Sequence, residues 1–190
     1  VNGLQRTGGL VGENTGSESE IIDSFSESSV VGNDGVGGLS GTNYSDASII
    51  RCFSNGSVSA QTQKGGLTGH GEVHSASFWD INSSGVSTSA GSGAVGKTTT
   101  KMKTPSTYLD AGWDFNQTGG TWKMTAGQTY TRLAWETLPN TTPSDLNTTA
   151  PLQVLENQPA GTLVGQFTAE DPDLPTTLAF TLVGGANDSH

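Results

Sequence analysis

Small and apolar positions recur along residues 1–79 with a period of 28 to 29 residues. A Gly-Gly-Leu-x-Gly motif begins at Gly8, Gly37 and Gly65, so each copy has one leucine at its third position. A period of this size is typical of proteins in which one structural unit stacks on the next. We therefore interpret the copies as repeats of one supersecondary unit.

The second half of each copy has the residue types of a strand. Residues 21–26 (Ile-Ile-Asp-Ser-Phe-Ser) return as residues 49–54 (Ile-Ile-Arg-Cys-Phe-Ser), and the third copy ends at Trp79. Side chains alternate along a strand, so Ile50 and Cys52 are expected on one face. No copy has the 3.6-residue apolar spacing of a helix. The pattern predicts an all-β fold, a parallel β-solenoid of about three coils with some three strands in each.

Residues 80–97 are small and polar, and we expect a loop there. An aromatic-rich stretch follows, and Thr104, Pro105 and Gly112 mark the start and stop of a short helix in it. We interpret residues 80–135 as a capping module whose aromatics close the open end of the solenoid. The alternative is that Trp113 and Trp122 face a ligand and stack on sugar rings.

The remaining chain divides at a proline-containing polar segment. Residues 136–149 are expected to be a linker. Alternation returns after it, which predicts the first strands of a β-sandwich over residues 150–190. The apolar positions of that alternation are Leu152, Val154, Val164, Phe167, Leu178, Phe180 and Leu182.

Two stretches resemble known families. The pattern Gly-Gly-Leu-x-Gly-x-Asn followed by Ile-x-x-Ser-Phe-Ser resembles the GLUG repeat of large bacterial surface and adhesin-like exoproteins, and residues 77–133 are similar to the module that terminates such arrays. Residues 154–162 (Val-Leu-Glu-Asn-Gln-Pro-Ala-Gly-Thr), with Ala-Glu-Asp-Pro-Asp at 169–173, resemble the opening of a cadherin-like domain.

The cadherin resemblance implies calcium ligands at Glu156, Asp171 and Asp173. In that family the glutamate and the aspartates belong to different sites. Calcium takes six to eight oxygen ligands, and three carboxylates divided over two sites fall short of that number. The expected site is therefore weak and incomplete, and the alternative interpretation is a solvated acidic turn.

Composition excludes several classes of function. A net charge of −10 and a pI near 4.4 provide no basic surface for nucleic acid. No apolar run is long enough to insert in a membrane. The single cysteine, Cys52, rules out an intrachain disulfide and is expected to be a small inward residue, not a nucleophile. Asp23 and Arg51 occupy equivalent outward positions and predict one surface ion pair.

Two local motifs match binding sites but lack their context. Gly91, Gly96, Lys97 and Thr98 fit the spacing of a phosphate-binding loop, yet no buried apolar strand precedes them, so we expect no nucleotide. The segment from His70 to His74 has two imidazoles but no fourth zinc ligand, and we expect turn residues there.

The resemblances and the composition together favour a non-enzymatic function. We expect a rigid stalk in a secreted or cell-surface bacterial protein that mediates adhesion or self-assembly. The expected partners are a cell-surface protein, a glycan, or another copy through the solenoid ends. The alternative is a carbohydrate-binding or carbohydrate-active β-helix module.

Overall fold

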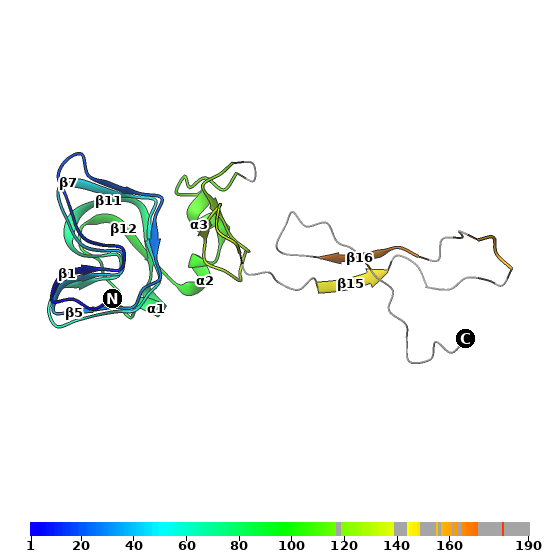
Figure 1. The fold of residues 1–190 in the computed structure, drawn as a ribbon, viewed down its shortest axis with the longest axis horizontal. Coiled ribbons are helices and arrows are strands. Elements are labelled where there is room, and N and C mark those ends of the chain that lie inside the picture. Colours follow the sequence, from blue (N-terminus) through cyan, green and yellow to red (C-terminus); the bar gives the residue numbers. More distant parts are fainter. Residues whose placement is uncertain are drawn as a thin grey trace. The chain divides into compact units, whose positions relative to one another are not determined.

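The computed structural model describes residues 1–116, 119–138, 144–148, 155, 157–160, 162, 165–170 and 180. The chain forms two compact units, Val1–Glu136 and Thr137–His190. Strands predominate in the described part, and the helices are short, which confirms the prediction of an all-β chain (Figure 1). None of the described helices has the length and apolar character needed to cross a membrane.

In the first unit the chain winds through successive turns, which we refer to as coils. Coil 1 contains β1 (Gln5–Gly8), β2 (Val11–Thr15), β3 (Glu20–Ile22), β4 (Phe25–Ser26) and β5 (Val30–Gly32). Coil 2 contains β6 (Asp34–Gly37), β7 (Ser40–Ile50), β8 (Phe53–Ser54) and β9 (Val58–Ala60), and coil 3 contains β10 (Lys64–Gly65) and β11 (Thr68–Asp80).

Strands at equivalent positions in successive coils pair in parallel. Val11 pairs with Ser40 and Phe25 with Phe53, so equivalent repeat positions are neighbours across the sheet. The largest sheet has the order β2-β7-β11-β8-β4, with β12 paired to β11 and β3 to β7, and a second sheet has the order β1-β6-β10. The repeat in the sequence therefore becomes a row of stacked, in-register strands.

The loop predicted for residues 80–97 is wrong over much of its length. Asp80 caps the short helix α1 (Ile81–Ser84) through bonds from the N–H groups of Asn82 and Ser83. The chain then forms β12 (Ser92–Lys97), which pairs in parallel with β11 and starts a partial coil 4. Small residues without alternation form a strand here because the edge of β11 supplies the backbone partners.

The glycines of the repeat allow close approach between backbones. A Cβ at Gly37 would lie 2.0 Å from the carbonyl oxygen of Ser40, and one at Gly38 would lie 2.2 Å from that of Gly66. The turn they form points into the coil, where Leu39 and Leu67 are completely buried (Figure 1). In the second and third copies the motif is thus an inward tip, in which glycines provide the space and the leucine fills the core, whereas Leu10 of the first copy is 49% exposed.

A bend in each coil changes which isoleucine is buried. Asp23, Arg51 and Ala76 occupy equivalent positions, and all three have φ between 45° and 49°. This bend breaks the alternation, so Ile49, not Ile50, joins Cys52 in the core. The prediction that Ile50 and Cys52 share one face is wrong for this reason.

The aromatic-rich residues form a module that we call the clasp. It comprises α2 (Thr99–Met102), α3 (Pro105–Leu109), β13 (Trp122–Lys123) and β14 (Arg132–Leu133), and the two strands pair antiparallel. The predicted helix is present, with Thr104 at its N-cap and Pro105 in its first turn. The clasp aromatics and the coil residues Phe53 and Phe78 together form one core cluster, distinct from the clusters around Leu39 and Val36 inside the coils.

The clasp lies against the side of the coils, and the prediction that it closes their open end is wrong (Figure 1). Phe25, Phe53 and Phe78 come from coils 1, 2 and 3, where they pair in register. Trp122 lies 6.3 Å from Phe25 and 6.2 Å from Phe53, measured between ring centroids. The aromatics pack here because the phenylalanines form an apolar ladder that runs across the coils.

In the second unit, β15 (Ser144–Thr148) pairs antiparallel with β16 (Phe167–Glu170). A strand therefore lies within residues 136–149, where a linker was expected. The predicted cadherin-like sandwich of residues 150–190 falls largely outside the described residues and stays a prediction.

Candidate functional site

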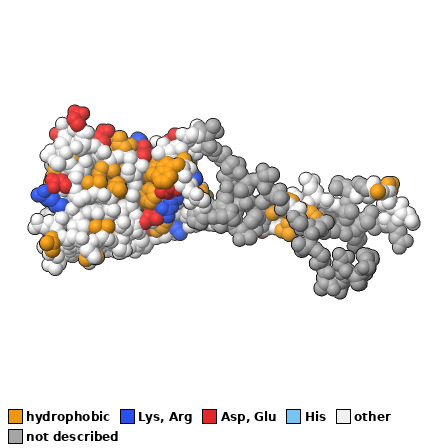
Figure 2. Space-filling model, in the orientation of Figure 1, with side chains coloured by type: hydrophobic (Ala, Val, Ile, Leu, Met, Phe, Trp, Pro, Cys, Tyr) orange, Lys and Arg blue, Asp and Glu red, His pale blue; other side chains and the backbone are white. Residues whose placement is uncertain are grey.

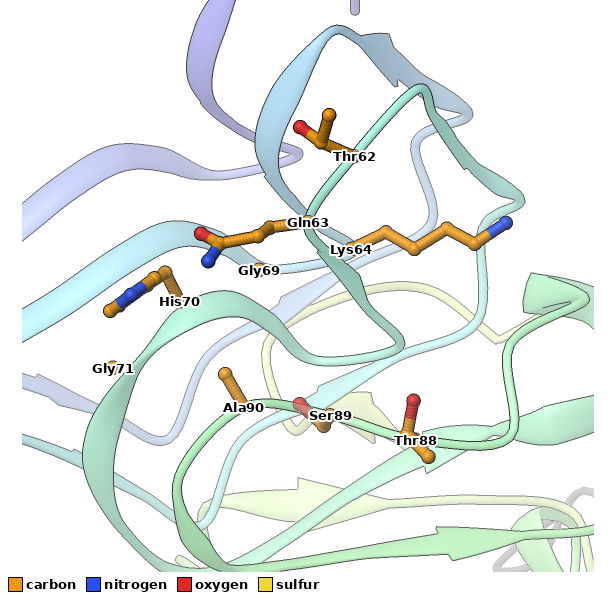
Figure 3. Close-up of a pocket in the computed structure, with 9 residues that line it drawn as sticks. All are labelled: Thr62, Gln63, Lys64, Gly69, His70, Gly71, Thr88, Ser89 and Ala90. Atoms are coloured by element: carbon orange, nitrogen blue, oxygen red, sulfur yellow. The ribbon is translucent and has the colours of Figure 1, made fainter.

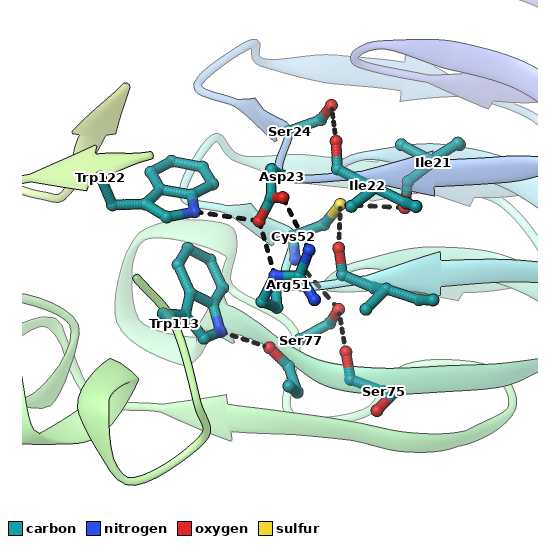
Figure 4. Close-up of polar contacts among 12 residues, drawn as sticks. Ile21, Ile22, Asp23, Ser24, Arg51, Cys52, Ser75, Ser77, Trp113 and Trp122 are labelled. Carbon is teal, nitrogen blue, oxygen red and sulfur yellow. Dashed lines mark hydrogen bonds and ion pairs between the residues drawn. The ribbon is translucent and has the colours of Figure 1, made fainter. Parts of the chain in front are cut away.

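The two tryptophans considered as ligand-facing lie inside the clasp core. Trp113 is 3% exposed and Trp122 is 2% exposed. The indole N–H of Trp113 donates to the carbonyl oxygen of Ala76, and that of Trp122 donates to Asp23 (Figure 4). Neither ring presents a face to solvent, so an exposed sugar platform at these residues is wrong, and burial agrees with the core interpretation.

The predicted calcium ligands Glu156, Asp171 and Asp173 lie outside the described residues. Within the described part, no group of three or more His, Cys, Asp or Glu side chains is placed to hold a metal ion. The calcium site therefore stays a prediction from the resemblance.

The two histidines of β11 lie in different surroundings. His74 is buried, with Nε2 2.8 Å from the Thr68 hydroxyl and Nδ1 3.2 Å from the Ser92 carbonyl oxygen. Burial lowers the pKa of His74, although the bond with Ser92 acts in the opposite direction. His70 instead contacts the Tyr44 hydroxyl through Nδ1, and the two rings lie 4.7 Å apart. The pair does not form a common site.

The segment with phosphate-loop spacing is mainly a strand. Gly96 and Lys97 belong to β12, and Thr98 caps α2 by accepting from the N–H of Lys101. The Lys97 ammonium lies 5.5 Å from the centroid of the Phe78 ring. These residues thus connect the coils to the clasp.

A polar groove of about 630 Å³ opens where coil 3 meets coil 4 (Figure 3). It exists because β10 pairs with β6 on one side only, within the described strands. The carbonyl of Thr88 accepts from Gly66 N–H and the N–H of Ala90 donates to Thr68, so this segment covers the inward turn but leaves β10 open. The lining residues are Thr62, Gln63, Lys64, Gly69, His70, Gly71, Thr88, Ser89 and Ala90.

Some lining side chains are fixed by the protein. The Ser89 hydroxyl accepts from the N–H of Thr68 at 2.9 Å. The Thr62 hydroxyl donates to Asp34 at 2.5 Å. This bond and one from the N–H of Gln63 lower the pKa of Asp34, so the carboxylate beside the groove stays ionised.

Other lining side chains are uncommitted. The side chains of Gln63, Lys64 and Thr88 are exposed and make no hydrogen bond or ion pair with any described residue. They provide an amide, an ammonium and a hydroxyl, a set that can both donate and accept hydrogen bonds. The groove is therefore suited to a polar, uncharged or weakly charged ligand.

Sequence reasoning missed the groove, although one signal pointed to it. The first two copies have Asn14 and Asn43 at one position, where the amide of Asn14 donates to that of Asn43 at 2.7 Å in a buried ladder. The third copy has Gly71 there, and His70 beside it, and both line the groove. The departure from the repeat thus coincides with the hollow.

No protein-family model, curated protein sequence or solved structure matches this chain.

Proposed function

We propose that the chain is a non-enzymatic structural and adhesive segment of a bacterial extracellular or cell-surface protein of the GLUG-repeat type. In this proposal the coils are a parallel β-solenoid that acts as a rigid stalk. The observation that carries it is the in-register parallel pairing of β2, β7, β11 and β12 across successive coils. Such pairing directs backbone hydrogen bonds along the stack, and each coil buries the apolar face of its neighbour.

The clasp supports the stalk interpretation because it contacts several coils at once. Arg132 forms an ion pair with Glu27 of coil 1 at 2.7 Å, and Trp122 bonds to Asp23 of the same coil. The Tyr130 hydroxyl donates to Asp80 of coil 3 at 2.6 Å. To separate one coil from the next, these lateral contacts would have to break together with the axial hydrogen bonds.

Two further features are consistent with assembly at a cell surface. Within the described strands, β1 and β2 of coil 1 pair on one side only, which supports end-to-end association of copies. The antiparallel β15–β16 pair supports a β-sandwich continuation, and the calcium ligands Glu156, Asp171 and Asp173 belong to that part of the proposal.

The test is to display the 190-residue chain on a non-adherent cell and count the cells retained under flow. The surfaces would carry mixed glycans, host-cell membrane protein, or the purified chain itself. We expect retention on at least one surface, and none for cells that display Gly37→Val, in which the inward turn cannot form. A folded chain that retains cells on none of the three would overturn the adhesive function.

A further inference from the structure

We propose that the groove beside β10 binds one or two sugar units of a glycan, with hydrogen bonds from Gln63, Lys64 and Thr88. This inference rests on the proposed adhesive function and names its ligand class and site. The groove volume of about 630 Å³ lies within the range of small-molecule sites. The three uncommitted side chains come from both walls of the hollow, β10 with its preceding turn and the segment before β12 (Figure 3).

The chemistry of these side chains matches a hydroxyl-rich ligand. A sugar hydroxyl donates one hydrogen bond and accepts others. Gln63 and Lys64 extend in opposite directions and Thr88 lies on the other wall, so different hydroxyls of the ligand would pair with the amide, the ammonium and the threonine hydroxyl (Figure 3). The carboxylate of Asp34 accepts from the Thr62 hydroxyl and so orients that lining side chain. A site built from mixed donors and acceptors favours sugars over ligands of a single charge.

The part of the groove formed by His70 and Gly71 is also preorganised. The Tyr44 hydroxyl and ring hold the imidazole of His70 in place. Gly71 leaves the floor open, and the backbone there cannot accept a larger residue without strain, because φ is 148° and a Cβ would lie 2.3 Å from the carbonyl oxygen of Asn43. Groups that are already held in place lose little conformational entropy when a ligand binds, so more of the interaction energy appears as affinity.

Other ligand classes fit the groove less well. Strand addition needs a longer free edge, whereas β10 spans two residues and carries Lys64, a residue that protects edge strands. A phosphate or nucleic acid would meet one lysine beside Asp34 in a chain of net charge −10. The face of the first unit drawn in Figure 2 is mostly uncharged, with scattered charged groups and no broad basic patch.

The test uses the ¹⁵N-labelled 190-residue chain and three uncharged probes: chitotetraose, mannotetraose and cellotetraose. We expect at least one probe to cause saturable amide shifts confined to residues 62–64, 69–71 and 88–90. Gln63→Ala and Lys64→Ala should each raise the Kd about five- to tenfold, since each removes one hydrogen-bonding group. Lys101→Ala, which changes an exposed lysine outside the groove, should leave the Kd unchanged.

Three results would overturn the proposal: no saturable shift with any probe, shifts centred on other residues, or a Kd unaffected by Lys64→Ala in a folded variant. If the groove binds none of the probes but displayed cells still adhere, only the sugar site is rejected. If the groove binds a probe but displayed cells do not adhere, the adhesive function is rejected and the binding site stands.

Discussion

Asp23 and Arg51, which occupy equivalent positions in coils 1 and 2, form a two-point ion pair across the stack. The Arg51 Nε and Nη2 atoms donate to the two carboxylate oxygens at 2.8 and 2.7 Å. Burial raises the pKa of Asp23, but the hydrogen bonds from Arg51 and Trp122 outweigh it, and the net effect is a lowered pKa. The predicted surface pair is therefore confirmed, and it also anchors the clasp (Figure 4).

Trp122→Phe should weaken this anchor. Phenylalanine keeps an aromatic ring in the clasp core but removes the N–H that donates to Asp23 at 3.1 Å. We expect the free energy of unfolding to fall by about 1.5 to 3 kcal/mol, the range for a hydrogen bond to a charged group. Urea denaturation followed by circular dichroism would measure the change.

Trp135→Phe is the matched control, because Trp135 is 80% exposed. Its effect should stay within about 0.5 kcal/mol, as for most surface substitutions. Equal effects of the two substitutions would contradict the role given to the Trp122 bond.

Gly37→Ala tests whether the repeat glycines serve close backbone approach. The new Cβ would lie 2.0 Å from the carbonyl oxygen of Ser40, and Gly37 and Ser40 both belong to paired strands. We expect a loss of about 3 kcal/mol or more, or failure to fold, because overpacking shifts the backbone itself. Gly112→Ala meets no atom within 4 Å and has φ of 78°, so it should cost about 1 to 2 kcal/mol from strain alone. A larger loss at Gly112 than at Gly37 would reject the close-approach explanation.

The repeat allowed the stacking of strands to be predicted, because equivalent residues such as Leu39 and Leu67 must share one environment when units stack. It could not show the bend at Arg51. A left-handed φ is uncommon at a non-glycine residue, and here it recurs at the equivalent Asp23, Arg51 and Ala76, so it belongs to the stacked strands and not to the preference of one residue type. The burial of Ile49 in place of Ile50 follows from that bend.

The location of the clasp and the groove was beyond sequence reasoning for a similar reason. The bond between Trp122 and Asp23 joins residues 99 positions apart, and no local pattern encodes it. The groove lies where coil 4 does not cover β10, and the position of that gap is set by how the coils pack on one another. Only the altered third copy, with His70 and Gly71, marked the place in advance.

Cys52 should be unreactive in the folded chain. Its side chain is completely buried, and burial raises the pKa of the thiol to about 12, so almost no thiolate is present at pH 8. Iodoacetamide should modify it only after denaturation, as mass spectrometry can show. Rapid modification of the native chain at pH 8 would mean that the core around Ile49 and Cys52 is open.

His74 should make stability depend on pH near neutrality. It pairs in register with Ile49 and takes the place of an apolar residue, and burial lowers its pKa below the ordinary value of 6.5. The folded state then binds fewer protons than the unfolded state, so stability is fully present above about pH 6.5 and falls as the pH drops through that value. The loss of a carboxylate contribution such as that of Asp23 begins lower, as the pH falls below the ordinary aspartate pKa of 3.8, so the two effects separate. Urea titrations of the 190-residue chain between pH 8 and pH 5 would measure the slope, and His74→Gln should remove most of it while His70→Gln leaves it. A flat profile, or a slope that survives in His74→Gln, would show that His74 is not held neutral between Thr68 and Ser92.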